Sequence, residues 1–248
     1  MSDCVIRVEN VGKLYPKQVT KLHTFRERLL KKNQDFEGQW SLKDVSFDIN
    51  AGESVAILGG NGSGKSTLLK VILGVTAPTT GSITVDGTIG GLIELGAGFH
   101  KELSGRENIY MNGVVLGLKE KDIDLIIDDI IEFAELEDHI DKPIKQYSSG
   151  MKVRLGFSIA IHVNSDIILL DEVLAVGDKR FKKKAMNAIR KYTKGKTVIF
   201  VSHSAHQVRR LCKKAIVLDK GQIVYMGETE KAIEFYENKV VDGLELAK

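Results

Sequence analysis

The residues from Gly59 to Ser66 have the types and the spacing of a phosphate-binding loop. They fit the pattern G-x-x-x-x-G-K-[ST], with an apolar strand predicted before them, over Glu53 to Leu58, and helical spacing after them, from Lys65 to Leu73. Glycines let the backbone curl so that successive N–H groups point at phosphate oxygens, and the helix N-terminus adds a positive dipole. This segment therefore predicts a site for the phosphates of a nucleotide.

The side chains of the loop are predicted to make different contacts with the nucleotide and its metal ion. Lys65 supplies a positive charge at the β and γ phosphates, the Ser66 hydroxyl suits Mg²⁺, and Thr67 can contact the α-phosphate. The loop residues predicted to bind nucleotide are Gly59, Gly60, Asn61, Gly62, Ser63, Gly64, Lys65, Ser66 and Thr67.

A second motif ends a strand predicted over Ile167 to Leu170. This apolar run is followed by Asp171 and Glu172, and ligands of such sheets bind beyond the carboxyl ends of the strands. Asp171 can hold magnesium directly or through water, whereas Glu172 points elsewhere and could polarise an attacking water. Kinases, GTPases and helicases share both motifs, so the two together leave the class of nucleotide-binding protein open.

A third motif, Tyr147-Ser148-Ser149-Gly150-Met151, precedes a helix predicted over Met151 to Val163. Small residues at a helix N-terminus form a second anion cradle, and one subunit has no need of two cradles for one triphosphate. Here the sequence resembles the ATP-binding-cassette (ABC) family, whose signature is LSGGQ. In that family, the signature of one subunit closes over ATP held by the other. Ser149 and Met151 depart from the Gly and Gln that the family usually has.

The resemblance implies ATP and Mg²⁺ as ligands and roles for further residues. Ser148 and Gly150 take the signature positions that face the γ-phosphate across the dimer, with Ser149 between them. His203 resembles the switch histidine, which donates to the γ-phosphate and orients the water that Glu172 activates as base.

Three more positions match the family's pattern in part. Asp178 resembles the loop that links the two ATP sites. Tyr15 resembles the aromatic residue that stacks on adenine, although a half-buried aromatic without that role would also fit. Glu94 stands where the family has its Q-loop Gln, and a carboxylate can also bind magnesium through water.

Longer segments narrow the resemblance to one branch. Glu94 to Phe99, Leu103 to Tyr110 and Asp171 to Asp178 look like the ATP-binding subunits of exporters for lipid-linked polysaccharides, namely O-antigens, capsules and wall teichoic acids. The branch implies an ATPase on the cytoplasmic face of the bacterial cell membrane. Its partners would be an integral membrane permease and a second copy of itself, with the glycan engaged indirectly and no nucleic acid bound.

Other functions are weighed against this one. The chain could serve another ABC transporter, including an importer, or be a soluble ABC ATPase acting on nucleic acid. The latter usually carries a long coiled-coil insert or two cassettes, which we do not see here. A regulator that binds ATP without turnover is disfavoured by Glu172 and His203.

The composition is that of an ordinary globular protein. The 248 residues are 43% apolar and 28% charged, with a net charge of +3, which does not by itself imply a nucleic-acid partner. Two cysteines, Cys4 and Cys212, fit a reducing compartment. No apolar run reaches about 18 residues, so the chain is not expected to cross a membrane unaided.

The elements around the motifs alternate between strand and helix, which predicts a mostly parallel sheet with covered faces. We expect an α/β P-loop NTPase (RecA-like) ABC core with an antiparallel β-subdomain and an inserted helical subdomain. The predicted organisation is one domain over 1–248, with the core at 1–100 and 148–248 and the helical subdomain at 101–147.

Local patterns give more detailed expectations. Cys4 to Val8 is predicted to be an edge strand, and a strand over Ser41 to Ile49 should turn Leu42, Val45, Phe47 and Ile49 inward. The turn Asp86-Gly87 predicts a hairpin that joins the strand of Ile83 and Val85 to a strand over Ile89 to Ile93.

The helices and the last hairpin are also predicted locally. Ser104 to Glu107 matches a capping box that opens a helix ending near Gly117, and Lys220-Gly221 is expected to turn a second hairpin. One face of the next helix should carry Ile123, Ile126, Ile127, Ile130, Ile131 and Ala134.

The segment from Lys17 to Lys32 holds six basic residues and one acid, and Leu22, Phe25 and Leu29 have helical spacing. It is predicted either as a solvated helical excursion or as a basic face turned to anionic lipid or a membrane partner.

Overall fold

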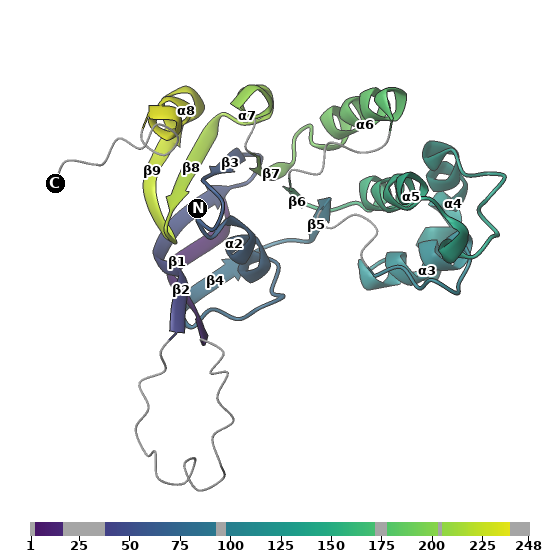
Figure 1. Ribbon diagram of the computed structural model, residues 1–248, viewed down its shortest axis with the longest axis horizontal. Helices are drawn as coiled ribbons and strands as arrows, with labels where there is room; N and C mark the ends of the chain where they lie inside the picture. The colour runs from purple at the N-terminus through teal and green to yellow at the C-terminus, as the bar shows by residue number, and fades with distance from the viewer. Residues whose placement is uncertain (1–2, 17–37, 93–97, 172–177, 203–204, 239–248) are drawn as a thin grey trace, which may run out of the picture. The chain divides into compact units, whose positions relative to one another are not determined.

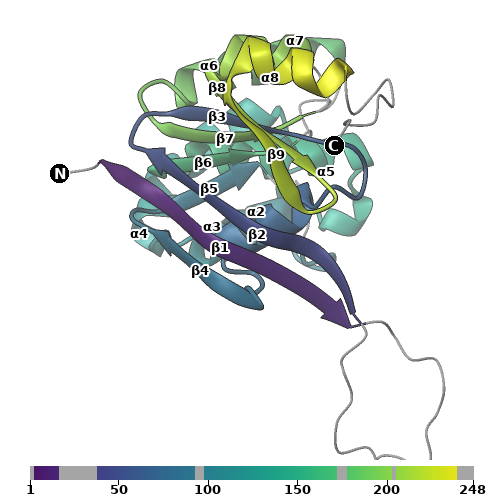
Figure 2. The same ribbon diagram turned by 90° about the vertical axis from the view of Figure 1, so that its left-hand side faces the viewer.

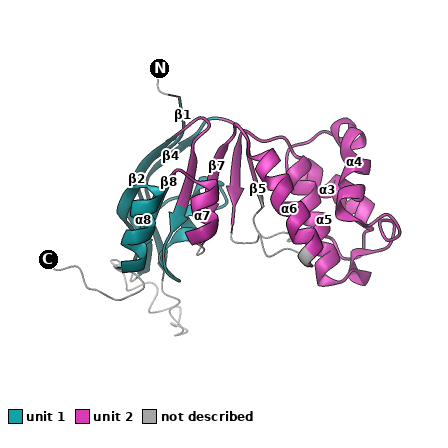
Figure 3. Ribbon diagram, turned by 90° about the horizontal axis from the view of Figure 1, so that it is seen from above, with its two compact units in different colours: residues 1–49, 57–86, 215–248 teal, residues 50–56, 87–214 magenta. Residues whose placement is uncertain are grey.

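The computed structural model describes residues 3–16, 38–92, 98–171, 178–202 and 205–238. The chain divides into two compact units (Figure 3). Unit 1 comprises Met1–Ile49, Ile57–Asp86 and Ala215–Lys248, and unit 2 comprises Asn50–Ala56 and Gly87–Lys214.

A three-stranded sheet lies in unit 1. Its strands are β1 (Cys4–Pro16), β2 (Gly38–Asn50) and β4 (Thr80–Val85), in the order β2-β1-β4 (Figure 2). β1 pairs with β4 in antiparallel fashion, and Ile6 lies opposite Val85. The expectation that Cys4 to Val8 forms an edge strand is wrong, because β1 has a hydrogen-bonded neighbour on either side.

The inward face of β2 is the predicted one. Leu42, Val45, Phe47 and Ile49 are all buried. The step of three residues between Leu42 and Val45 breaks the strict alternation of a strand, and Asp44 between them has a φ of 49°. This left-handed residue lets both apolar neighbours face the core.

A second sheet has the strand order β5-β6-β7-β3-β8-β9. Its strands are β3 (Ser54–Leu58), β5 (Ile89–Leu92), β6 (Ile167–Leu170), β7 (Thr197–Val201), β8 (Lys214–Asp219) and β9 (Gln222–Glu228). β6 pairs in parallel with both β5 and β7, and each of its four residues is completely buried. The fully buried strand predicted over Ile167 to Leu170 is confirmed.

The hairpin predicted at Asp86-Gly87 is wrong, because β4 and β5 belong to different sheets. β5 begins instead beside β6. The Thr88 N–H donates to Asp166 Oδ2 over 2.8 Å, and the Asp166 and Ile167 N–H groups donate back to the Thr88 carbonyl. Gly90 permits this pairing, since a Cβ there would lie 2.2 Å from Ser165 Oγ. Long-range pairing therefore overrides the local turn signal.

The last hairpin forms as predicted. Lys220 and Gly221 connect β8 to β9 with φ values of 46° and 82°. Two residues with positive φ are what a two-residue turn between twisted strands requires.

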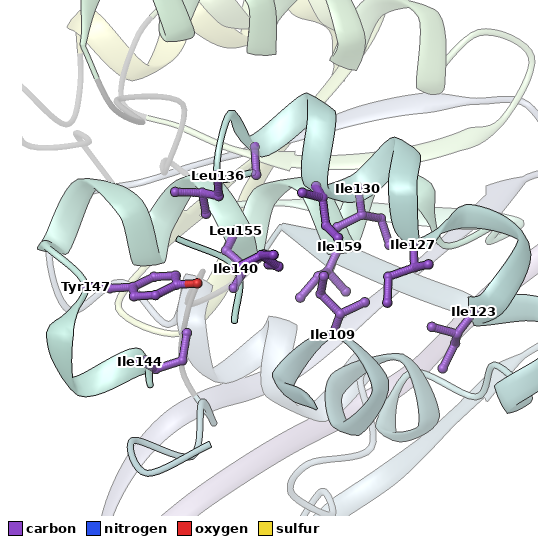
Figure 4. Close-up of a cluster of buried hydrophobic side chains, with 12 residues drawn as sticks. Ile109, Ile123, Ile127, Ile130, Leu136, Ile140, Ile144, Tyr147, Leu155 and Ile159 are labelled. Atoms are coloured by element: carbon purple, nitrogen blue, oxygen red, sulfur yellow. The ribbon is translucent and has the colours of Figure 1, made fainter. Parts of the chain in front are cut away.

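Three helices of unit 2 enclose a shared apolar core. They are α3 (Gly105–Val115), α4 (Glu120–Ala134) and α5 (Ser149–His162), and a short 3-10 turn, η1 (Ile144–Gln146), precedes α5. Ile109 of α3, Ile123 and Ile127 of α4, and Leu155 and Ile159 of α5 point into this core (Figure 4). The predicted apolar face of α4 is confirmed, with Ile126 partly buried at its margin.

The capping box of α3 is also confirmed. The Glu107 N–H donates to Ser104 Oγ over 3.2 Å, and the Ser104 N–H donates to Glu107 Oε2 over 2.8 Å. The remaining helices are α6 (Lys179–Tyr192) and α7 (Ala205–Leu211) in unit 2, and α2 (Lys65–Ile72) and α8 (Thr229–Tyr236) in unit 1 (Figure 1).

Within the described ranges, no helix is long and apolar enough to span a membrane. The segment from Lys17 to Lys32 lies outside the described residues.

Candidate functional site

The phosphate-binding loop joins β3 to α2 in unit 1, as its sequence context predicts. The last four residues of β3 are buried, and α2 begins at Lys65. Gly64, the residue before the helix, has a φ of 108°, and a Cβ there would lie 2.6 Å from the Ser41 carbonyl. Only glycine meets both conditions without strain.

Lys65 folds back over the loop. Its Nζ donates to the Gly59 carbonyl over 2.7 Å and to the Gly60 carbonyl over 2.9 Å, and the side chain is buried. These bonds hold the ammonium against the backbone at the start of the loop. The first N–H groups of a helix have no intrahelical partner. No acidic residue lies in the first turn of α2. The arrangement favours a polyanion at this helix end.

Two hydroxyl groups of the loop differ in their surroundings. Ser63 Oγ is buried and has no hydrogen-bond partner among the described residues, whereas Ser66 is exposed. A buried hydroxyl without a partner is costly unless a ligand or water pairs with it. The loop thus fits a phosphate ligand on an observation independent of its sequence pattern.

The outer side of the loop is braced by β2 and by the turn between β8 and β9. The Gly221 N–H donates to the Ser63 carbonyl over 2.9 Å, and the Lys43 N–H donates to the Gly221 carbonyl over 2.8 Å. The hydroxyl groups of Ser41 and Thr67 lie 2.7 Å apart. The Thr67 hydroxyl is thereby held at the first turn of α2.

Tyr15 lies near the end of β1, in the same unit as the loop. Its side chain is 42% exposed, and Lys13 Nζ lies 5.4 Å from its ring centroid. An exposed ring of this kind can accept a stacked base.

Asp171 follows the buried strand β6 in unit 2, at the carboxyl end that the sequence predicts. Its side chain is partly exposed. Three other predicted site residues, Glu94, Glu172 and His203, lie outside the described residues.

The motif Ser148 to Gly150 forms the N-terminus of α5 in unit 2. Ser148 is the N-cap residue, and its Oγ accepts the Met151 N–H over 3.2 Å. Ser148 and Ser149 are exposed, and a Cβ added to Gly150 would approach nothing closer than 3.9 Å. The first turn contains no acidic residue. The cradle predicted for a second anion is therefore an open helix N-terminus.

Tyr147 directly precedes Ser148 and anchors the N-terminus of α5. Its ring is buried, its hydroxyl donates to the His139 carbonyl over 2.7 Å, and burial raises the pKa of its phenol to about 12. Gly105 leaves room for it, since a Cβ there would lie 2.2 Å from the Tyr147 hydroxyl. The buried and hydrogen-bonded Tyr147 thus fixes the position of the backbone directly before Ser148.

Asp178 is the N-cap residue of α6. Its Oδ1 accepts the N–H groups of Arg180 and Phe181, each over 2.9 Å. The bond from the Phe181 N–H is the main cause that lowers the pKa of the Asp178 carboxyl, and the Arg154 charge contributes less. The residue is exposed, so it presents a charged carboxylate at a fixed helix end.

One residue that sequence reasoning missed connects three helices of unit 2. Glu135 ends α4 and accepts from Arg154 of α5 and from Lys184 of α6. The available signal was an acidic residue directly after the last apolar position of a helix, where Gly or Asn is usual.

Comparisons with known proteins place these motifs in one family. Residues 42–175 match the family model described as ABC transporter. The O-antigen export system ATP-binding protein RfbB of Klebsiella pneumoniae is 46% identical over 198 residues, covering 79% of this chain and 80% of that protein. The teichoic acids export ATP-binding protein TagH of Listeria innocua is 41% identical over 236 residues, covering 95% and 70%.

Solved structures agree in fold. An ATP-binding subunit of an ABC transporter gives a TM-score of 0.73 at 21% identity, over 98% of this chain and 95% of that one. A dimeric ATP-binding cassette bound to ADP and phosphate gives 0.70 at 24% identity, over 90% and 98%. The α/β fold predicted from the sequence is confirmed. On the extent of these matches, the chain belongs to the ABC transporter family.

Proposed function

We propose that this chain is the ATP-binding and hydrolysing subunit of an exporter that moves a lipid-linked polysaccharide across the cytoplasmic membrane. The polymer would be wall teichoic acid, an O-antigen or a capsule. Relatives with 41% and 46% identity are named for the export of teichoic acids and of O-antigen. The observation that carries the ATPase part is the loop from Gly59 to Lys65, with its folded-back lysine and a buried Ser63 hydroxyl that has no partner in the part of the chain that the structure describes.

In this proposal, ATP binds through its phosphates to the loop residues Gly59, Gly60, Asn61, Gly62, Ser63, Gly64, Lys65, Ser66 and Thr67. Lys65 exchanges its carbonyl partners for the β and γ oxygens, and Tyr15 stacks on the adenine. Such a site works by positioning the phosphates and stabilising the charge that develops on them.

The hydrolytic roles follow the family resemblance. Glu172 is the base that takes a proton from the attacking water, and His203 donates to the γ-phosphate. Mg²⁺, which takes one or two protein oxygens besides phosphate oxygens, would be held by the Ser66 hydroxyl and the Asp171 carboxylate, with Glu94 acting through water. When bound, it would neutralise charge on the phosphates.

A second copy completes the site in this proposal. Ser148, Ser149 and Gly150 of one copy offer an open helix N-terminus to the γ-phosphate bound by the other, and Asp178 lies at the contact between the copies. The exposure of Ser148 and the lack of an acid in the first turn of α5 support this role. Closure on ATP and release after hydrolysis form a ligand-driven population shift.

The second partner would be an integral membrane permease, which places the chain at the cytoplasmic face of the bacterial membrane. We propose that residues 101–147 act as the helical subdomain that passes the motion on, within a single domain over 1–248. The polymer would reach this subunit only indirectly, through the permease, and no nucleic acid would be bound.

The test of the phosphate site compares two lysines of α2. Lys65→Ala should weaken ATP binding at least about 10-fold in calorimetry, because it removes the buried charge at the loop. Lys70→Ala, on the exposed side of the same helix, should leave it unchanged. Equal affinities for both variants would overturn the loop assignment.

The test of the remaining roles uses turnover and assembly. Glu172→Gln should retain ATP binding and abolish phosphate release, and Ser148→Arg should block ATP-driven dimerisation in gel filtration without blocking binding by one subunit. Co-purified with a candidate permease, the protein should hydrolyse ATP faster when lipid-linked glycan is added. A rate indifferent to every such glycan would refute the proposed cargo.

A further inference from the structure

Glu135 combines an unfavourable backbone conformation with an unusual set of partners. It caps the C-terminus of α4 with φ 56° and ψ 51°, a left-handed conformation that glycine or asparagine normally supplies. A glutamate in this conformation raises the free energy of the folded state, and interactions of its side chain can offset that cost.

The carboxylate of Glu135 binds two cations from two other helices. Arg154 Nη1 of α5 lies 3.5 Å from Oε2, and Lys184 Nζ of α6 lies 3.2 Å from Oε1. The exposed fractions of the three side chains are 34% for Glu135, 21% for Arg154 and 35% for Lys184. Such partly buried, charge-assisted bonds are stronger than exposed ion pairs.

Both cations make further contacts that fix their direction. Lys184 Nζ also donates to the Phe133 carbonyl over 2.9 Å and lies 4.6 Å from the Phe133 ring centroid. The Arg154 guanidinium lies 5.8 Å from the Phe181 ring centroid. The two rings meet edge to face, with centroids 5.9 Å apart. The two cations that bind Glu135 thus also contact the aromatic pair that joins the last turn of α4 to the first turn of α6.

The bridged helices begin at the two exposed loop ends described above. α5 begins after Ser148 and carries Arg154, and α6 begins after Asp178 and carries Lys184 (Figure 1). We infer that Glu135 is a positioning residue that ties the N-terminal halves of α5 and α6 together through Arg154 and Lys184, so that Ser148 and Asp178 at the starts of these helices are presented to the partner copy as one rigid pair. This inference rests on the proposed function, because it takes both residues as groups that meet the second copy.

Two substitutions separate this role from a merely structural one. Glu135→Gln keeps the size of the side chain and removes its charge. Glu135→Gly removes the carboxylate and relieves the left-handed backbone, so we expect thermal stability equal to or above that of the wild type. Glu132→Gln, at an exposed glutamate on the same helix, is the matched control.

We expect the Glu135 substitutions to lower the turnover rate without changing the affinity for ATP. Both Glu135 variants should lower kcat about 10-fold and weaken ATP-driven dimerisation to a similar degree, while ATP affinity at the Lys65 loop changes less than about 2-fold. Adding Arg154→Met to Glu135→Gln should cause a further loss smaller than the loss from Arg154→Met alone, because the two side chains interact. Wild-type turnover and dimerisation in both Glu135 variants would overturn the inference, as would a fall in turnover that merely follows a fall in stability.

A second measurement does not depend on turnover. The Lys152 N–H donates to the Ser148 carbonyl and the Lys182 N–H donates to the Asp178 carbonyl, so their hydrogen exchange reports on the two helix ends. In Glu135→Gln, both amides should exchange at least about 5-fold faster, and in Glu132→Gln neither should. Unchanged exchange at both amides in Glu135→Gln would overturn the inference. A wild-type protein that hydrolyses no ATP would instead refute the proposed function, and the exchange measurement would still test the inference.

Discussion

Asn108 provides the sharpest test of how the chain before α3 is held. The residue lies in the first turns of α3 and is completely buried. Its Oδ1 accepts the His100 N–H over 2.8 Å, and its Nδ2 donates to the carbonyls of Ser104 at 2.8 Å, His100 at 3.1 Å and Leu103 at 3.2 Å. Since the amide has two hydrogens, we count about three effective bonds.

The cost of losing these bonds follows from their number. At about 1 kcal/mol net for each bond, with a further penalty for backbone groups left buried and unpaired, Asn108→Ala should lower the free energy of unfolding by about 3–4 kcal/mol. Asn112→Ala removes one bond, from Nδ2 to the Asn108 carbonyl over 2.9 Å, and should cost about 1 kcal/mol. Urea unfolding at pH 7 measures both values.

Asn108→Asp adds a pH dependence with a definite sign. The carboxylate would face the same three carbonyl oxygens without a proton to donate, so burial and repulsion would raise its pKa in the folded state above that in the unfolded state. As the pH rises, the introduced carboxyl group therefore loses its proton first in the unfolded state. The free energy of unfolding falls over the pH range between its unfolded-state pKa and its folded-state pKa. This variant should therefore gain stability relative to the wild type between pH 7 and pH 5. An Asn108→Ala cost under about 0.5 kcal/mol, or an Asp variant indifferent to pH, would refute the reasoning.

Three further predictions concern buried groups. Gly105→Ala should destabilise the protein by about 1–3 kcal/mol in the same urea assay, because its Cβ would lie 2.2 Å from the Tyr147 hydroxyl; a neutral effect would contradict the packing. Burial raises the pKa of Tyr147 to about 12, so the stability it contributes below pH 10 should be lost between pH 10 and 12; alkaline unfolding of Tyr147→Phe should be less steep in that range. Burial also raises the pKa of the Cys212 thiol to about 12, so iodoacetamide at pH 8 should alkylate it about 1,000-fold more slowly in the folded than in the unfolded protein; comparable rates would show an exposed thiol.

Features that depend on neighbours in the sequence were predictable. The capping box at Ser104 and the strand–loop–helix context of Lys65 follow from spacing and residue type alone. The buried residues of β2 follow from their apolar type, although Asp44 interrupts their alternation. Physical chemistry fixes these locally, since a cap or a glycine turn needs only adjacent residues.

Features that depend on partners far along the chain were not predictable in the same way. Asp86-Gly87 has the composition of a hairpin turn, but the pairing of Thr88 with Asp166, 78 residues away, sends the chain to another sheet. The bridge from Glu135 to Lys184 spans 49 residues, and no spacing rule reports it. The roles of Glu94, Glu172 and His203 stay predictions from sequence.

The brace behind the phosphate loop has a consequence for how the protein is made. Gly221 supports Ser63 and is supported by Lys43, so the loop takes its final shape from a turn that lies 158 residues further along the chain. A ribosome synthesises the loop before the turn. A nascent chain cut before Lys220 would hold every residue of the phosphate-binding pattern and still lack the support behind it, so competence to capture nucleotide should emerge only after the turn at Gly221 has been synthesised.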